Sequence, residues 1–250
     1  MRRTERVHRL DEDHAAHEVT IRLARLFRVS ETASLEQRGP VFVLGLGETE
    51  NRFNFDSIAR LMSLLDQVDA APGEKALVTV AEGKFWSNGL DLEWMIANKI
   101  DLADLVVAVQ ELFARVLEAP YPTVAAIQGH CYAAGGMLAL AHDARFMRED
   151  RGFLCFPEVD IKMNFTVGMS SLLTAKLSAQ TAHQAMVLGR RFTAPEAATA
   201  GILDATLPEP ELVSGAIAYA ETLVGKDPAT IQAIKRTIYG PTLDLLRTAP

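Results

Sequence analysis

The sequence predicts an α/β protein with a helical tail, and three observations support this prediction. Runs of β-prone apolar residues at 41–46, 76–80 and 123–127 are typical of strands. The last two runs each lead through a turn of small residues into a helix-like stretch. Beyond about residue 180 the pattern is helical. An α/β body followed by helices is therefore expected.

Residues 1–38 are polar and are predicted to form a lead-in segment. Within it, apolar and polar residues alternate over 19–23, which is typical of a strand. After the strand at 41–46, a helix is predicted over 55–68, because its apolar residues share one face. Pro72-Gly73 ends that region. The apolar face consists of Ile58, Leu61, Met62 and Leu65.

The middle of the chain is predicted to alternate between helices and short strands. Asp101 or Asp104 is expected to cap a helix that reaches Leu117 and ends before Pro120. A helix of small residues is expected at about 135–142. Further strands are predicted at 144–147 and 153–156.

The tail is predicted to consist of helices. Ser178 or Thr181 is expected to start one, and Thr193 to cap another that has proline in its first turn. Two more are predicted over 211–223 and 229–238. The resulting division is a lead-in segment over 1–38, a core domain over 39–184 and a C-terminal helical region over 185–250.

Composition narrows the class of protein. The chain has 250 residues, 49 % of them hydrophobic, which is enough for one large domain or a domain with an appendage. The net charge of −7 favours neither nucleic acid nor an anionic membrane as a partner. Cys131 and Cys155 lie in apolar segments, so buried, reduced thiols are expected, with no disulfide framework or zinc site.

The chain carries no evident targeting signal, and a cytoplasmic location is expected. No apolar run approaches the roughly 20 residues that span a membrane. The first residues are rich in arginine, but the acids among them are unlike a transit peptide. Residues 247–250 are not a peroxisomal address of the Ser-Lys-Leu type.

Three familiar motifs fail on inspection. Gly45-Leu46-Gly47 begins like a dinucleotide fingerprint, but Glu50 replaces the third glycine and would repel a pyrophosphate. The segment 168–172 lacks the final glycine of a nucleophile elbow. His142-Asp143 ends a predicted helix, and a structural pair is the preferred interpretation.

The two turns carry most of the functional information. They are Phe85-Trp86-Ser87-Asn88-Gly89-Leu90-Asp91 and Gly129-His130-Cys131-Tyr132-Ala133-Ala134-Gly135-Gly136. Strand-to-helix turns built from small residues leave backbone N–H groups unpaired. Two such donors can hold a developing oxyanion, so acyl chemistry is the first hypothesis.

These turns, their order and their separation resemble those of the crotonase (enoyl-CoA hydratase/isomerase) superfamily, and the Δ3,Δ2-enoyl-CoA isomerases within it most of all. The resemblance covers about 39–239. It implies a spiral of β-β-α units, an acyl-CoA thioester substrate, no cofactor beyond the CoA of that substrate, and no metal. It also implies that the C-terminal helices assemble a homotrimer or homohexamer. Its further motifs are 50–54, Pro157-Glu158, 194–197 and 200–203.

The same resemblance assigns the catalytic groups. It implies that the N–H groups of Asn88 and Ala134 form the oxyanion hole. Hydratases of the family carry a glutamate where this chain has Met137, whereas the second family glutamate matches Glu158. A single carboxylate suffices to shift a double bond from 3-enoyl-CoA to trans-2-enoyl-CoA. Asp160 is the fallback carboxylate.

Substrate contacts are expected around the same segments. Arg52, Lys84, Lys235 and Arg236 are candidates to offset the CoA phosphates, and backbone carbonyls near Trp86 resemble those that hold adenine. Methionines suit a pocket for variable acyl chains. The predicted substrate-binding residues are Arg52, Asn54, Trp86, Ser87, Leu90, Asp91, Gly135, Met137 and Phe165, and Met95, Ile96 and Met169 are further candidates for the acyl pocket.

Two alternatives remain open from sequence. One is another single-glutamate crotonase activity on an acyl-CoA. The other is a catalytically silent acyl-CoA-binding homologue, which Met137 favours because methionine transfers no proton. Lys162-Met163-Asn164 also departs from the glycine, leucine and proline usual in relatives.

Overall fold

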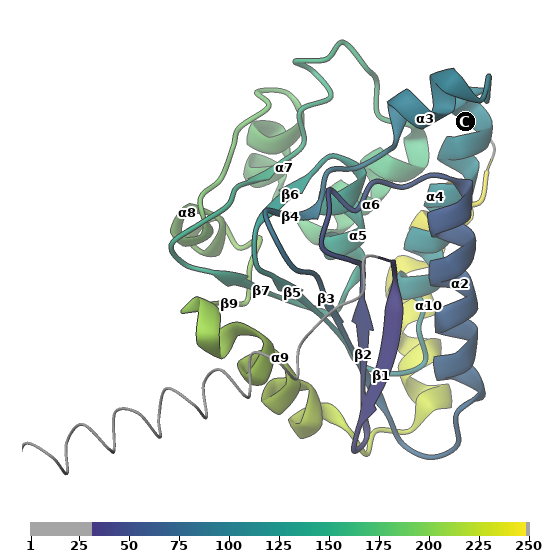
Figure 1. Cartoon of the computed structure of the whole chain (residues 1–250), viewed down its shortest axis with the longest axis vertical. Coiled ribbons are helices and arrows are strands. Elements are labelled where there is room, and N and C mark those ends of the chain that lie inside the picture. The colour runs from purple at the N-terminus through teal and green to yellow at the C-terminus, as the bar shows by residue number, and fades with distance from the viewer. Residues whose placement is uncertain (1–31, 249–250) are drawn as a thin grey trace, which may run out of the picture.

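Two sheets organise residues 32–248, the part of the chain that the computed structural model describes (Figure 1). In the larger sheet all neighbouring strands are parallel except the first pair. The smaller sheet is parallel throughout. The larger sheet runs β1 (Ser34–Arg38), β2 (Val41–Gly45), β3 (Ala76–Val80), β5 (Thr123–Ile127), β7 (Ala144–Arg148) and β9 (Ala205–Leu207), and the smaller one β4 (Phe85–Ser87), β6 (His130–Tyr132) and β8 (Leu154–Cys155).

A β-β-α unit repeats three times and confirms the predicted spiral. Strands β3, β5 and β7 of the larger sheet each lead into a strand of the smaller sheet, and each pair is followed by helix. The helices that follow are α3 (Leu92–Ala97) with α4 (Leu102–Leu117), then α5 (Ala134–Ala141), then α6 (Val167–Lys176). The elements of the three units recur at irregular intervals along the chain, so the repeat is evident in the structure but not in the sequence.

Both faces of the larger sheet are covered, and its central strands are accordingly buried throughout and mostly apolar. One face packs against α9 (Glu209–Leu223), where Leu212, Ala216 and Ala220 form a cluster with strand residues such as Val78 and Val124. The helices of the other face are α2 (Phe55–Ala70), α4, α5, α6 and α10 (Pro228–Leu246).

Side-chain caps set the helix starts as the sequence predicts. Asp101, rather than Asp104, caps α4 by accepting a hydrogen bond from the Ala103 N–H at 2.9 Å. Ser178 caps α7 (Ala179–Met186), and Thr193 with Glu196 forms a capping box on α8 (Ala194–Thr199).

Two boundaries differ from expectation. The larger sheet begins at Ser34 rather than beyond residue 38, because β1 pairs with β2 as a polar edge strand. Helix α10 continues to Leu246 through Pro241, although proline in a helix interior costs about 3 kcal/mol. Packing of α10 against α4 and α6 outweighs that cost. The strand predicted at 19–23 lies outside the described residues.

Candidate active site

The smaller sheet brings the two turns into contact. Strands β4 and β6 are paired neighbours, so the turns that follow them lie side by side. A Cβ placed on Gly89 would lie 3.3 Å from the backbone nitrogen of Ala134. A Cβ on Gly135 would lie 2.7 Å from the Ser87 carbonyl oxygen. The glycines therefore permit an approach that a larger residue would prevent.

The first turn is held in place by the loop between β2 and α2. The Asn88 N–H donates to the Glu50 carbonyl at 2.9 Å, and the Gly89 N–H donates to Ser87 Oγ at 3.2 Å. The backbone N–H of Leu90 has no hydrogen-bond acceptor among residues 32–248. The N–H of Asn88, predicted to be an oxyanion donor, is thus already bonded, whereas the N–H of Leu90 is free among the described residues.

Asn51 completes this support. Its side-chain amide donates to the backbone carbonyls of Phe85 and Trp86, each at 3.1 Å. Its backbone carbonyl accepts a hydrogen bond from Ser87 Oγ at 2.8 Å. The Trp86 carbonyl, expected to face adenine, thus has a partner within the protein. Sequence reasoning placed Asn51 in a family motif but gave it no role.

The second turn presents the other donor. Ala133 has φ +49°, a left-handed conformation that is strained for a residue with a Cβ. Its N–H donates to the Cys155 carbonyl at 2.9 Å, and Ala134 then begins α5. The Ala134 N–H has no partner within the described part of the chain, as is usual for the first turn of a helix. It lies at the positive end of the helix dipole.

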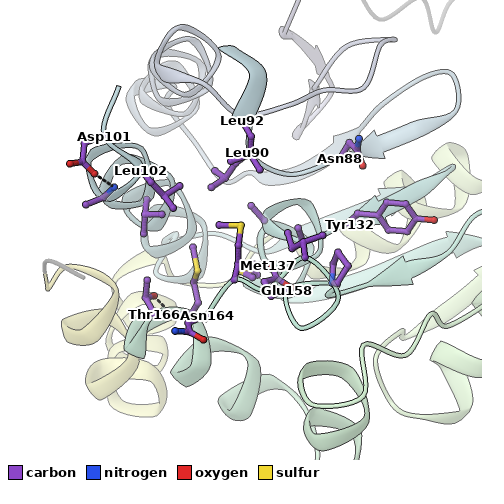
Figure 2. Close-up of a pocket in the computed structure, with 18 residues that line it drawn as sticks. Asn88, Leu90, Leu92, Asp101, Leu102, Tyr132, Met137, Glu158, Asn164 and Thr166 are labelled. Atoms are coloured by element: carbon purple, nitrogen blue, oxygen red, sulfur yellow. Dashed lines mark hydrogen bonds between the residues drawn. The ribbon is translucent and has the colours of Figure 1, made fainter. Parts of the chain in front are cut away.

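A cavity of about 540 Å³ lies beside these donors. Figure 2 shows Met137 and Glu158 in its middle, with Leu90 and Leu92 above them. It brings together five of the predicted site residues: Asn88, Leu90, Ala134, Met137 and Glu158. Met169, also expected there, lines it too. Its remaining lining residues are Leu92, Asp101, Leu102, Ala103, Val106, Tyr132, Ala133, Pro157, Ile161, Met163, Asn164 and Thr166.

Glu158 is the one buried carboxylate among the residues that line this cavity. Its exposed fraction is 6 %, and its Oε2 atom is buried with no hydrogen-bond partner among residues 32–248. Removal from water disfavours the charged form, so burial raises the pKa of Glu158 from 4.5 to about 7. A carboxylate with this pKa is a suitable base near neutral pH.

The unpaired position of Glu158 also affects stability. The unfolded chain releases this proton near pH 4.5 but the folded protein releases it near pH 7. The free energy of unfolding therefore falls as the pH rises through this window. Glutamine does not titrate, so Glu158→Gln lacks this loss. Between pH 4 and pH 8 its free energy of unfolding should rise relative to that of the parent by up to about 3 kcal/mol. Urea unfolding at both pH values measures the gain; a pH-independent difference would contradict the raised pKa.

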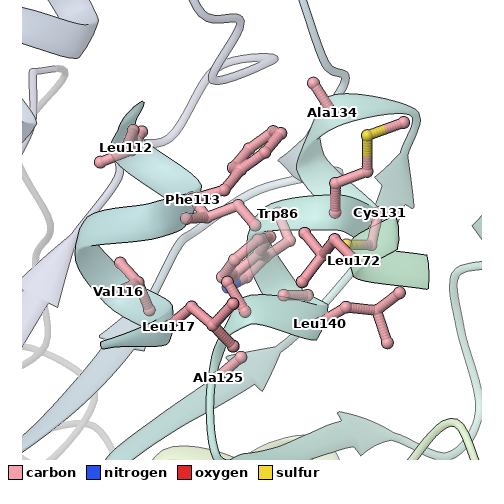
Figure 3. Packing of buried hydrophobic residues seen from close by; sticks show 14 of the residues in the cluster. Trp86, Leu112, Phe113, Val116, Leu117, Ala125, Cys131, Ala134, Leu140 and Leu172 are labelled. Carbon is pink, nitrogen blue, oxygen red and sulfur yellow. The ribbon is translucent and has the colours of Figure 1, made fainter. Parts of the chain in front are cut away.

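Several predicted substrate contacts lie behind the cavity wall. Trp86 is fully buried, and Figure 3 shows it packed among Phe113, Leu117 and Leu140. Its side chain is therefore part of the core and does not line the cavity. Ser87 and Gly135 are buried where the turns meet, and Phe165 packs against the core outside the cavity lining.

Arg52, Asn54 and Asp91 line a second cavity of about 550 Å³ instead. Arg52 is ion-paired with Glu50 at 2.5 Å and with Glu93 at 3.4 Å, so two carboxylates already balance its positive charge. Asn54 is committed to capping α2 and to a hydrogen bond with Asp91.

Two proposed phosphate partners in the tail are also engaged elsewhere. Lys235 is buried and paired with Asp143 at 2.7 Å, and Arg236 is paired with Glu118 at 3.4 Å. A buried lysine paired in this way does not serve an external phosphate. Lys84 is exposed and lies over the Phe85 ring.

Sequence reasoning missed the helix that forms one wall of the cavity. Leu102, Ala103 and Val106 of α4 line it at helical spacing. Their pattern indicated only a helix with an apolar face, and nothing local shows whether such a face meets core or cavity. Tyr132 and Thr166 were given no role either, whereas Met163 had been noted only as part of the departure at 162–164.

Comparison with known proteins identifies the family. Residues 41–247 match the family model described as enoyl-CoA hydratase/isomerase. Enoyl-CoA delta isomerase 2, peroxisomal, of Arabidopsis thaliana is 37 % identical over 82 % of this chain and 91 % of its own length. Enoyl-CoA delta isomerase 3 of the same plant is 35 % identical with the same coverage.

Solved structures share the architecture. A probable enoyl-CoA hydratase from Mycobacterium tuberculosis has a TM-score of 0.80 and 24 % identity, covering 87 % of this chain and 92 % of its own. The fold is thus the crotonase fold. Together with the match over 41–247, it establishes that this chain belongs to the enoyl-CoA hydratase/isomerase family.

Within residues 32–248 no group of three His, Cys, Asp or Glu residues is arranged to hold a metal ion. None of the helices described there is both long and apolar enough to cross a membrane.

Proposed function

We propose that this protein is an enoyl-CoA delta isomerase, which converts 3-enoyl-CoA into trans-2-enoyl-CoA. The observation that carries the proposal is Glu158, a buried carboxylate whose Oε2 atom has no hydrogen-bond partner among residues 32–248, in an apolar cavity beside two backbone donors that are free in the same range. Relatives named enoyl-CoA delta isomerases, 34–37 % identical to this chain, support the choice of reaction.

The reaction needs one base and one oxyanion site. Glu158 removes a proton from C2 of the substrate, and the resulting dienolate places negative charge on the thioester oxygen. The N–H groups of Leu90 and Ala134 donate to that oxygen. Glu158 then delivers the proton to C4, the double bond moves to C2–C3, and the carboxylate is restored.

Met137 favours isomerisation over hydration. It is buried and lines the cavity. The family resemblance puts it where hydratases carry their first glutamate. Its thioether neither activates water nor transfers a proton. Asp101 is the other carboxylate in the lining, and it is engaged as the cap of α4.

The direct test is turnover of 3-hexenoyl-CoA, followed by the absorbance of the conjugated 2-enoyl product. We expect isomerisation without measurable hydration of trans-2-hexenoyl-CoA by the same preparation. Rapid hydration would overturn the proposal and would mean that water is activated without a carboxylate at residue 137.

The pH dependence should report the base. Because Glu158 must be ionised to accept a proton, and its pKa is about 7, kcat/KM should fall about tenfold per pH unit below that value. Steady-state rates between pH 5 and pH 9 measure this limb. A limb near pH 4.5, the ordinary glutamate value, would show that Glu158 is not the group that titrates.

The alternatives predict different outcomes. A silent acyl-CoA-binding homologue would bind the substrate but would not exchange protons at C2. Another single-glutamate crotonase would exchange them without moving a double bond. Deuterium exchange at C2 of a bound acyl-CoA, measured beside 3-hexenoyl-CoA turnover, separates these possibilities.

Assembly and environment complete the proposal. We propose a homotrimer or homohexamer built on the C-terminal helices over 185–250, with CoA entering as part of the substrate and no separate cofactor. A cytoplasmic location remains a prediction; two of the Arabidopsis relatives carry the word peroxisomal in their names.

A further inference from the structure

Partly or fully exposed residues line the cavity beside Glu158 at two ends. At one end Asn88, Tyr132 and Ala133 line it and are partly exposed. We call this the donor end, because it adjoins the free N–H of Ala134. Figure 2 shows Asn88 and Tyr132 together on one side, with Met137 and Glu158 nearer the middle.

The other end lies at the start of α4. Asp101, Ala103 and Asn164 line the cavity there and are exposed. Figure 2 places Asp101 and Thr166 on the side opposite Asn88. We call this the α4 end. Charges of both signs adjoin these residues in the chain, so no single sign dominates: Lys99, Asp104 and Lys162.

The walls between the two ends are apolar. Leu102 and Val106 of α4 face the cavity on one side, and Met137, Met163 and Met169 contribute unbranched thioether side chains. Such side chains adapt to a flexible hydrocarbon. Beyond Glu158 toward α4, the next polar lining groups are at the exposed rim.

The chemistry fixes which end receives which part of the substrate. A thioester held by Leu90 and Ala134 directs its sulfur to one side of the carbonyl carbon and C2 to the other. Since C2 must face Glu158, the chain beyond it points toward α4. The CoA part then leaves through the donor end.

Charge near the donor end agrees with this direction. The pKa of His130, which is hydrogen-bonded to Tyr132, is lowered by burial and further by the nearby charges of Lys84, Arg151 and Arg191. These cations would attract the phosphates of CoA at this end, although the protein as a whole is negative.

We propose that the substrates are long-chain 3-enoyl-CoA thioesters, whose hydrocarbon chain crosses the cavity from the donor end and emerges at the α4 end. This rests on the proposed function for the identity of the site. A passage open at its far end sets no upper limit on chain length, whereas a closed pocket would.

Binding of saturated acyl-CoAs tests this independently of turnover, because they contain no double bond to move. Calorimetry on the full chain would compare hexanoyl-, decanoyl- and hexadecanoyl-CoA below their micelle concentrations. Affinity should rise by up to about fourfold per buried methylene and then level off where the chain reaches water. Weaker binding of hexadecanoyl-CoA than of decanoyl-CoA would indicate a closed end and overturn the inference.

A plug at the α4 end provides the second measurement. Ala103→Trp should lower the affinity for hexadecanoyl-CoA at least tenfold relative to hexanoyl-CoA. Asp104→Trp, at the next, exposed position that does not line the cavity, is the matched control and should leave that ratio unchanged. An unchanged ratio in Ala103→Trp would show that the chain does not leave there. Absent isomerase turnover would overturn the proposed reaction without altering these affinities.

Discussion

Replacing Glu158 with Gln should lower kcat for 3-hexenoyl-CoA isomerisation by at least about 10²–10⁴-fold, the usual contribution of a positioned acid–base group. The amide has nearly the shape of the carboxyl group but cannot accept the C2 proton. The affinity for hexanoyl-CoA should be unchanged or slightly higher, because no buried charge has to be accommodated. Stopped assays of product formation and calorimetry measure the two quantities on the same preparation.

Asp160→Asn is the matched control for this experiment. Asp160 lies two residues further on, is exposed, and does not line the cavity. It was the fallback carboxylate from sequence, and its replacement should leave kcat unchanged. If Asp160→Asn were inactive and Glu158→Gln active, the two roles would be exchanged and the proposed mechanism would fail.

Most of the architecture could be predicted because its signals are local. The apolar strands at 41–46, 76–80 and 123–127 appear within a residue of their predicted bounds. Caps such as Asp101 and Thr193 depend on neighbours within a few residues, which sequence displays directly. Helix α10 was predicted too short, because its continuation through Pro241 depends on packing against distant helices.

The site residues likewise divide into those that local sequence motifs identify and those that depend on distant contacts. Glu158 and the second turn were identified from motifs, and the structure places both at one cavity. In the first turn the predicted donor, Asn88, is hydrogen-bonded within the protein, and the free N–H lies two residues further on, at Leu90. The difference depends on the Glu50 carbonyl, which is 38 residues away in the chain and reaches Asn88 only through the fold. Side-chain chemistry alone could not show which backbone N–H remains free.

This distinction leads to the other large expected effect, which concerns the backbone rather than a side chain. Replacing the peptide bond at Leu90 or at Ala134 by an ester, with the corresponding α-hydroxy acid, removes one N–H and keeps the side chain. Each change should lower kcat by about 10²–10³-fold, the usual loss for one oxyanion donor. Affinity for the saturated hexanoyl-CoA should change far less, because its carbonyl carries little negative charge.

The same ester at Asn88 is the matched control, and it separates the two possible assignments. It removes the hydrogen bond from Asn88 to the Glu50 carbonyl. In the proposed mechanism this bond holds the turn, and the Asn88 N–H does not donate to the oxyanion. We therefore expect a lower free energy of unfolding, by about 1 kcal/mol, with a kcat much closer to that of the parent. A large loss of kcat at Asn88 and none at Leu90 would restore the donor that sequence suggested. The bond to Glu50 would then have to break when substrate binds, and the first turn would be a moving part of the site rather than a fixed one.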